Sequence, residues 1–364
     1  MWHSRAALLF AALLSLPVLA QTSGAAAQAQ QAQQFIAEGK FNEAIRIYRE
    51  LLRSSPGNAI LLQNLCIAEY SAKLYRDAIV HAAAALKLEP SLAPARLFLG
   101  GSYLELGDYP NAIEALKLAV EANPRDRNGR LMLGEALVEI GQPAAALEHL
   151  PQAAEMLPDN PRVWYALARA HQALGEASAS KQAWERLTAL PPSWQSHVHA
   201  AEEDRAAERW RDASAEWREA VRLAPEKPRI RLGLGEALFR ARDYTLAMET
   251  LKPLLNTDNA EAEFLYGASL LNLQQPTEAI PYLRTAIARD ARLLPARAAL
   301  GQAFLQTSKA EEAIPLLASA VSVDRDGSIH FQLFRAYQLT HREAEARRAL
   351  AEYQRFRASP GVRP

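Results

Sequence analysis

Prolines recur along the chain at an almost constant interval. They stand at Pro56, Pro90, Pro124, Pro158, Pro192 and Pro225, so that successive prolines are 34, 34, 34, 34 and 33 residues apart. A fixed period of this length is typical of repeat proteins, because each repeat is a small unit that buries its apolar face only by stacking on its neighbours. The chain is therefore expected to form a solenoid and not a single compact core.

Small residues recur with the same period. Twelve positions before the prolines stand Ala44, Ala78, Ala112, Ala146, Ser180 and Ala213. Earlier in the repeat a leucine precedes a small residue, as in Leu99-Gly100 and Leu133-Gly134, and the pair returns after the last of these prolines in Leu234-Gly235. Small residues at fixed positions indicate that two helices approach closely there, where a larger side chain would not fit.

Each repeat also contains two apolar runs at helical spacing, joined by a short turn. In residues 93–126 a glycine in this turn, Gly107, suits the left-handed conformation that often ends a helix. Pro124 ends the second run, because the residue before a proline disfavours the α-helical region. Hydrophobic residues make up 49% of the chain without strand-type alternation, so an all-α fold is predicted.

The residues at these recurring positions resemble those of the tetratricopeptide repeat family. The repeat at residues 93–126 has the family's signature in Leu99, Gly100, Tyr103, Gly107, Tyr109, Ala112, Ala119 and Pro124. The resemblance covers residues 25–358 in about ten repeats. Their first residues are Ala25, Ala59, Ala93, Arg127, Pro161, Trp194, Pro228, Ala260, Leu294 and Gly327. It implies a right-handed superhelical solenoid of helix-turn-helix repeats that binds other proteins.

Several residues depart from the repeat pattern. Pro151 and Pro253 lie well inside second helices, where each removes a backbone hydrogen bond and should kink its helix. Pro281 and Pro315 stand closer to the helix starts and should be better tolerated. The repeat that begins at Trp194 is the most divergent, with Glu208 in place of the turn glycine.

The first twenty residues have the composition of a secretory signal peptide. His3 and Arg5 form a short basic start, residues 6–14 are an unbroken apolar run, and Val18-Leu19-Ala20 offers small or compact residues for cleavage. We expect export to a bacterial periplasm or cell envelope, with cleavage after Ala20 and no stable membrane span afterwards. The alternative is an uncleaved N-terminal anchor. The last residues, 359–364, are expected to be a disordered tail.

Charge and motif content argue against several functions. Lysine plus arginine and aspartate plus glutamate each number 41, and this balance argues against a nucleic-acid-binding surface. The chain has no glycine-rich phosphate loop, no H-E-x-x-H and no paired-cysteine zinc pattern, and no cofactor is expected. Cys66 is the single cysteine and occupies the small-residue position of its repeat, so we expect a small buried residue and not a reactive thiol.

Two alternatives to a peptide-binding scaffold stay open. A metal-binding or enzymatic protein would use the region of His197 and His199, which cannot share one helix face and would need a further ligand from a neighbouring helix. A structural spacer in an envelope complex would instead bind through its ends or its convex face. The scaffold is the preferred interpretation and is non-enzymatic.

The resemblance implies that the first helix of each repeat lines a concave face that holds the partner. The lysine and asparagine set with which chaperone-binding members hold a carboxylate is absent, which argues against a chaperone adaptor. Arginines and aromatic residues gather in the middle repeats, a combination typical of interface hot spots. The predicted contacts are Tyr165, Arg169, Arg205, Arg229, Phe239 and Arg240. Because arginine holds carboxylates in a bidentate manner, an acidic and partly apolar peptide is the expected ligand.

Overall fold

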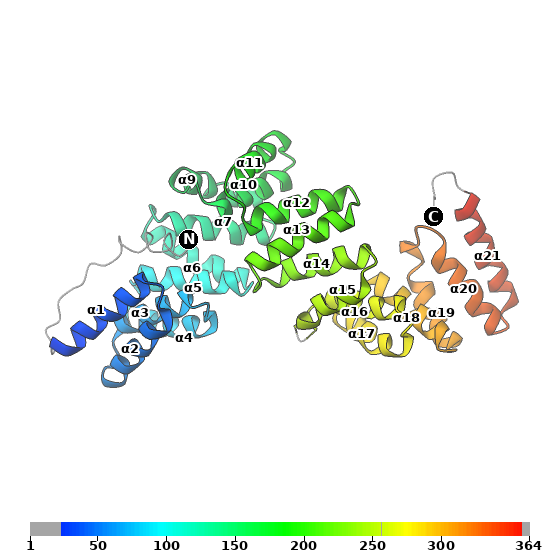
Figure 1. Ribbon diagram of the computed structural model, residues 1–364, viewed down its shortest axis with the longest axis horizontal. Coiled ribbons are helices and arrows are strands. Elements are labelled where there is room, and N and C mark those ends of the chain that lie inside the picture. Colours follow the sequence, from blue (N-terminus) through cyan, green and yellow to red (C-terminus); the bar gives the residue numbers. More distant parts are fainter. Residues whose placement is uncertain (1–22, 256, 359–364) are drawn as a thin grey trace. The chain divides into compact units, whose positions relative to one another are not determined.

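The computed structural model describes residues 23–255 and 257–358, and the regular structure of these residues is entirely helical (Figure 1). The predicted signal peptide, residues 1–20, and the predicted disordered tail, residues 359–364, lie outside the described residues. The chain divides into two compact units at residue 191, and each unit is described by itself.

The first unit consists of helices that alternate between the first and second position of a repeat. They are α1 (Ser23–Ala37), α2 (Phe41–Ser54), α3 (Ala59–Ser71), α4 (Tyr75–Leu88), α5 (Ala93–Glu105), α6 (Tyr109–Ala122), α7 (Arg127–Glu139), α8 (Pro143–Ala146), α9 (Leu150–Met156), α10 (Pro161–Ala173) and α11 (Ala177–Ala189). From α2 to α9, each second helix packs against the first helix of its own repeat and of the next one, and α11 packs against α10, so the helix pairs of this unit form a stack.

The second unit continues the same alternation. Its helices are α12 (Trp194–Ala206), α13 (Trp210–Leu223), α14 (Pro228–Arg240), α15 (Tyr244–Leu251), the 3₁₀-helix η2 (Lys252–Leu254), α16 (Ala260–Asn272), α17 (Pro276–Arg289), α18 (Leu294–Gln306), α19 (Ala310–Ser319), the 3₁₀-helix η3 (Val321–Val323), α20 (Ser328–Leu339) and α21 (Glu343–Ala358). The predicted repeat starts between Ala59 and Leu294 are the first residues of first helices, so the predicted all-α repeat organisation is confirmed.

The turn inside each repeat places one residue in the left-handed conformation. Gly107 has a φ of 79°, and the amide of the next residue, Asp108, donates to the carbonyl of Tyr103 at 2.9 Å. This bond satisfies a carbonyl at the end of the helix that would otherwise lack a partner. At the same turn position, non-glycine residues also adopt positive φ: Lys73, Glu208, Arg242, Gln274, Ser308 and His341.

Prolines shape the second helices as expected. The second helix that contains Pro151 is divided into α8 and α9, and the one that contains Pro253 ends at Leu251 and continues as the 3₁₀-helix η2. In contrast, α17 runs through Pro281 and α19 runs through Pro315. All four prolines lack the N–H that an interior helical position requires. Pro281 and Pro315, each the sixth residue of its helix, leave α17 and α19 continuous, as predicted.

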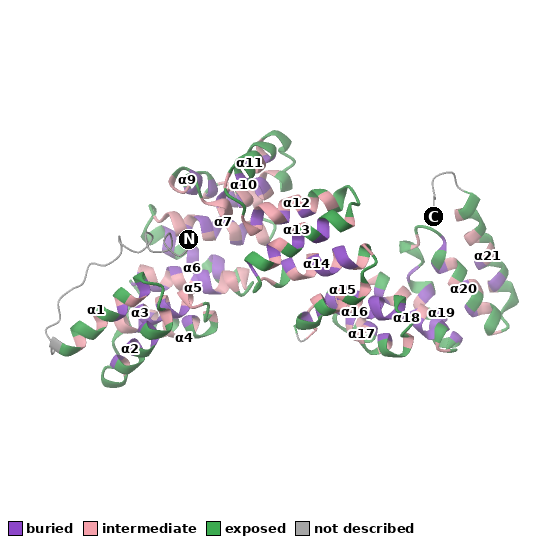
Figure 2. Ribbon diagram, viewed as in Figure 1, coloured by how far each residue is buried: buried purple, intermediate pink, exposed green. Residues whose placement is uncertain are grey.

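The core lies between helices and follows the small-residue positions (Figure 2). Ala44, Ala78, Ala112, Ala146 and Ala213 are completely buried. Cys66 is buried as a free cysteine, as predicted, and burial raises the pKa of its thiol. Within residues 23–255 and 257–358, none of the helices is long and apolar enough to cross a membrane.

Candidate protein-binding faces

Within each unit, first helices of successive repeats touch one another, from α3 to α10 in the first unit and from α14 to α20 in the second, and each series is here called a first-helix row. In the first unit α3 contacts α5, α5 contacts α7, and α7 contacts α10. In the second unit α14 contacts α16, α16 contacts α18, and α18 contacts α20. Side chains on these helices that point away from the core therefore lie beside side chains of the adjacent repeats, although the residues are far apart in the sequence.

In the first unit, Arg162 of α10 is the centre of an ion network in this row. Its guanidinium donates to both carboxylate oxygens of Glu135 on α7, at 2.8 and 2.6 Å, and to Glu105 on α5 at 3.4 Å. Burial by itself would lower the pKa of Arg162, but attraction to Glu135 and the hydrogen bond with it outweigh burial and raise the pKa. Arg162 is therefore a fixed cation held by two carboxylates.

Tyr70 of α3 extends this network to a fourth helix. Burial raises the pKa of Tyr70, and the charge of Arg162 acts in the opposite direction. The Tyr70 ring meets the ring of Phe98 edge to face, with centroids 5.1 Å apart. The row in this unit thus combines a half-buried phenol, an aromatic pair and an ordered arginine.

Two of the predicted contact residues, Tyr165 and Arg169, lie one turn and two turns beyond Arg162 on α10. The guanidinium of Arg169 lies over the Tyr165 ring, 5.6 Å from its centroid, and also donates to the carboxylate of Glu139 on α7. Tyr165 meets the ring of Trp184 edge to face at 5.6 Å. These contacts hold the side chains of Tyr165 and Arg169 in place, and Arg169 already has a carboxylate partner within the chain.

The other predicted residues lie in the second unit, on α12 and α14. Arg205 donates to Glu202 at 2.7 Å, and its charge also acts on Glu236 and Glu261. Burial raises the pKa of Glu261, and the nearby Glu236 raises it further. The surroundings of Arg205 therefore contain more carboxylates than the sequence pattern suggested.

Arg240 and Phe239 stand next to each other at the end of α14. The guanidinium of Arg240 lies 5.7 Å from the Trp210 ring centroid and 4.0 Å from Glu236. The Phe239 ring meets the Tyr244 ring edge to face at 5.6 Å. Arg229 lies in the first turn of the same helix. Glu236 interacts with the charges of both Arg205 and Arg240, so these two predicted residues lie in the same part of the unit.

The two histidines considered for metal binding each lie near a different glutamate. His197 Nδ1 lies 2.7 Å from Glu216 on α13, whereas His199 Nε2 lies 3.8 Å from Glu203. Burial lowers the pKa of His199. Among the residues that the structure describes, no group of three histidine, cysteine, aspartate or glutamate side chains is placed to hold a metal ion.

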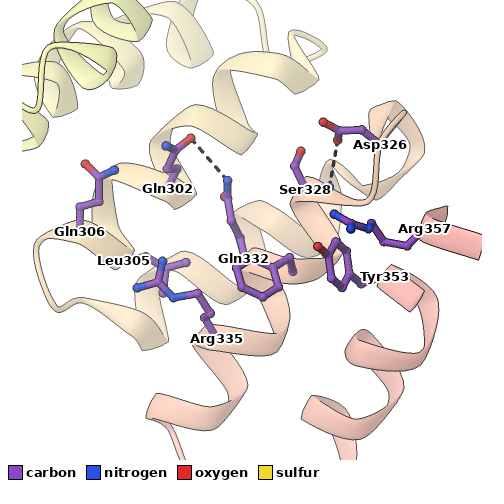
Figure 3. A pocket seen from close by; sticks show the side chains of 10 residues that line it. Gln302, Leu305, Gln306, Asp326, Ser328, Gln332, Arg335, Tyr353 and Arg357 are labelled. Carbon is purple, nitrogen blue, oxygen red and sulfur yellow. Dashed lines mark hydrogen bonds between the residues drawn. The ribbon is translucent and has the colours of Figure 1, made fainter. Parts of the chain in front are cut away.

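The second unit also contains a pocket of about 480 Å³ between α18, α20 and α21, here called the C-terminal pocket (Figure 3). It is lined by Gln302, Leu305, Gln306, Asp326, Ser328, Phe331, Gln332, Arg335, Tyr353 and Arg357. None of these residues is among the contacts predicted from the sequence. They were missed because Gln332 and the two residues from α21 do not stand out in the repeat pattern.

Stacked helix pairs, a continuous first-helix row and an ordered polar lining define a helical-repeat scaffold for protein–protein interaction. Tetratricopeptide repeat models match residues 69–136 and 137–203, and a second tetratricopeptide repeat model matches residues 199–262 and 266–328. The chain belongs to the tetratricopeptide repeat family, whose members are generally non-enzymatic scaffolds. No curated protein matches the sequence.

Solved structures with this fold share little sequence with the chain. The APC/C hetero-tetramer Cut9-Hcn1 is 13% identical, with 90% of this chain and 76% of that chain covered and a TM-score of 0.58. A MamA protein is 21% identical, with 45% and 89% covered and a TM-score of 0.40. A tetratricopeptide repeat protein from Parabacteroides merdae ATCC 43184 is 13% identical, with 78% and 100% covered and a TM-score of 0.38. These likenesses concern the fold alone.

Proposed function

We propose that the protein is an exported, non-enzymatic scaffold of the bacterial periplasm or cell envelope that binds a peptide segment of another protein along its first-helix row. The observation that carries this proposal is the ordered lining of the row in the first unit. There Glu105, Glu135 and Arg162 come from three successive first helices and hold one another in place, and the pKa of Tyr70, on the first helix before them, responds to the charge of Arg162.

The energetics of this lining favour a role in recognition. The Arg162 side chain is 30% exposed and that of Glu135 is 17% exposed. A partly buried ion pair adds little to stability, because the loss of hydration offsets the attraction between the charges. However, ordered donors, acceptors and rings lose little conformational entropy when a ligand binds. A preformed polar and aromatic row therefore suits an extended or helical peptide.

The proposed location is supported by the sequence of residues 1–20 and can be tested directly. We expect the mature protein, recovered from the native envelope, to begin at Gln21. Mass spectrometry of its N-terminus measures this. A mature chain that retains Met1 or Trp2 would contradict cleavage and favour the uncleaved anchor.

Site-specific photocrosslinking in the native envelope tests the binding face. A photoreactive phenylalanine derivative replaces Tyr165 in the row or, as a matched control, Glu185 on α11, whose side chain is 64% exposed. We expect Tyr165 to capture a defined protein and Glu185 to capture none of it. Equal capture at both positions would favour a spacer that is bound through its outer face, and would contradict the proposed groove.

A further inference from the structure

The arginines of the C-terminal pocket differ from three arginines on earlier first helices. Arg162, Arg169 and Arg205 each have a carboxylate of the chain as a partner. Within residues 23–255 and 257–358, Arg335 and Arg357 make no ion pair with any side chain, although both line the pocket. In Figure 3 the two guanidinium groups lie on either side of Gln332.

The pocket carries an excess of positive charge. Asp326 is the only carboxylate among its lining residues, and its Oδ1 accepts a hydrogen bond from the backbone N–H of Ser328 at 2.9 Å. The lining therefore contains two guanidinium groups and one carboxylate, and this carboxylate already has a backbone partner. Arginine holds carboxylates in a bidentate geometry, so the pocket is complementary to an acidic ligand.

Gln332 provides a second and independent indication of a ligand. Its Nε2 donates to Gln302 Oε1 over a long distance of 3.4 Å, while its Oε1 is buried and has no hydrogen-bond partner. A buried acceptor without a donor is costly, and such atoms are rare in folded proteins. Rotation of the Gln332 side chain toward the pocket would let a ligand with an N–H group, such as a peptide backbone, supply the missing donor.

The pocket also offers an apolar surface beside these polar groups. Phe331 is 39% exposed, and its ring centroid lies 5.1 Å from that of Tyr353 on α21. Leu305 of α18 lies on the other side of the pocket in Figure 3. The volume is within the range of sites that hold a small ligand or a few peptide residues.

We infer that the C-terminal pocket binds an acidic segment of a protein partner, with carboxylates at Arg335 and Arg357 and a backbone N–H at Gln332. This inference rests on the proposed function, because it assigns one peptide subsite of the same scaffold. An apolar side chain of the segment packs on Phe331 and Tyr353.

The test uses purified full-length protein and a library of random twelve-residue peptides displayed on phage. Peptides selected on the wild type are synthesised with amidated ends, and their affinities are measured by fluorescence polarisation. Each peptide is also made with glutamine in place of its glutamates and asparagine in place of its aspartates. Inorganic phosphate is added as a competitor, to separate recognition of a carboxylate segment from general anion binding.

The variants are Arg335→Gln, Arg357→Gln and Gln332→Met, and the control is Arg347→Gln on the same helix as Arg357. Arg347 is 83% exposed and pairs with Glu343 at 3.3 Å, outside the pocket. We expect enriched peptides to be acidic and each pocket arginine variant to weaken them roughly tenfold to hundredfold, as for lost hydrogen bonds to charged groups. The control should bind as the wild type does.

Gln332→Met separates a binding role from a structural one. Methionine fills a similar volume without the buried oxygen, so the thermal midpoint should not fall, yet peptide affinity should weaken several-fold. Peptides that show no acidic enrichment, that bind the arginine variants unchanged, or that are displaced by millimolar phosphate would overturn the pocket assignment and leave the scaffold function standing. Selection of no peptide at all would count against both.

Discussion

Leu116 occupies the space that any side chain on Gly100 would need. A Cβ atom on Gly100 would lie 2.6 Å from Leu116 Cγ, closer than Cβ contacts in real proteins allow. The same relationship recurs between Gly134 and Leu150, at 2.5 Å to Cγ, in the following repeat. The first and second helices of a repeat therefore pack by placing one large residue against one residue without a side chain.

This contact predicts that Gly100→Leu destabilises the protein. Inserting a side chain into a packed helix contact forces neighbours to move, at a cost of about 1–3 kcal/mol or more. Ala112→Leu, at a completely buried position on the second helix, should act in the same direction. Urea unfolding followed by circular dichroism measures the change. Gly57→Ala is the control, because a Cβ there would have nothing within 4 Å, and an equal loss in this variant would contradict the packing explanation.

In the second repeat, the same contact between the two helices is made by two residues of intermediate size. Cys66 stands at the position of Gly100 and Ala82 at the position of Leu116, each 34 residues earlier, and both are completely buried. Ala82→Leu alone should therefore destabilise the protein by about 1–3 kcal/mol, and adding Cys66→Gly should restore part of that loss. A double-mutant cycle in urea measures the coupling. Strictly additive effects would show that the two side chains do not share one space.

The divergent turn at Glu208 offers a stabilising substitution. Glu208 has a φ of 55°, a left-handed conformation that costs a residue with a side chain about 1–2 kcal/mol. Glu208→Gly removes this strain but increases the freedom of the unfolded chain, so a net gain of about 0.5–1 kcal/mol is expected. Glu203→Gly, within α12, should instead destabilise by about 1 kcal/mol. A lower thermal midpoint for Glu208→Gly would contradict the expectation.

His81 makes the stability of the first unit depend on pH. Its Nδ1 lies 2.7 Å from the buried carboxylate of Glu69, and this hydrogen bond raises the pKa of His81, whereas burial and the charge of Arg49 lower it. Because the folded pKa is above the ordinary value of about 6.5, the stabilisation is complete below pH of about 6.5 and is lost as the pH rises through the folded value.

Urea midpoints between pH 5.5 and 8.5 test this linkage. The wild type should lose stability as the pH rises, and His81→Gln, which keeps a hydrogen-bond donor but does not titrate, should show a smaller slope. His341→Gln, at an exposed turn, is the control. A slope that is unchanged in His81→Gln would show that another group is responsible.

The sequence predicted the repeat register accurately because the register depends on local chemistry. Pro124 and Gly107 limit helices through their own backbone preferences, and such preferences repeat wherever the residues repeat. The predicted exceptions to the repeat pattern were also confirmed, because Pro151 and Pro253 interrupt their helices. The candidate site was less predictable. Arg169 and Arg205 were expected to hold ligand carboxylates, but each has a carboxylate partner within the chain.

By itself, the sequence determined the helix pairs, their boundaries and the small residues at their contacts, because these depend on residues close together in the chain. Only the tertiary structure decided which charges are neutralised. Arg162 meets Glu135 across 27 residues, and this pairing exists because stacking brings α7 and α10 together. Arg335 has the same type of side chain but lies where stacking brings amides and rings close and supplies no carboxylate partner among the described residues. A charge pair needs two side chains to meet in space, which no periodic pattern encodes.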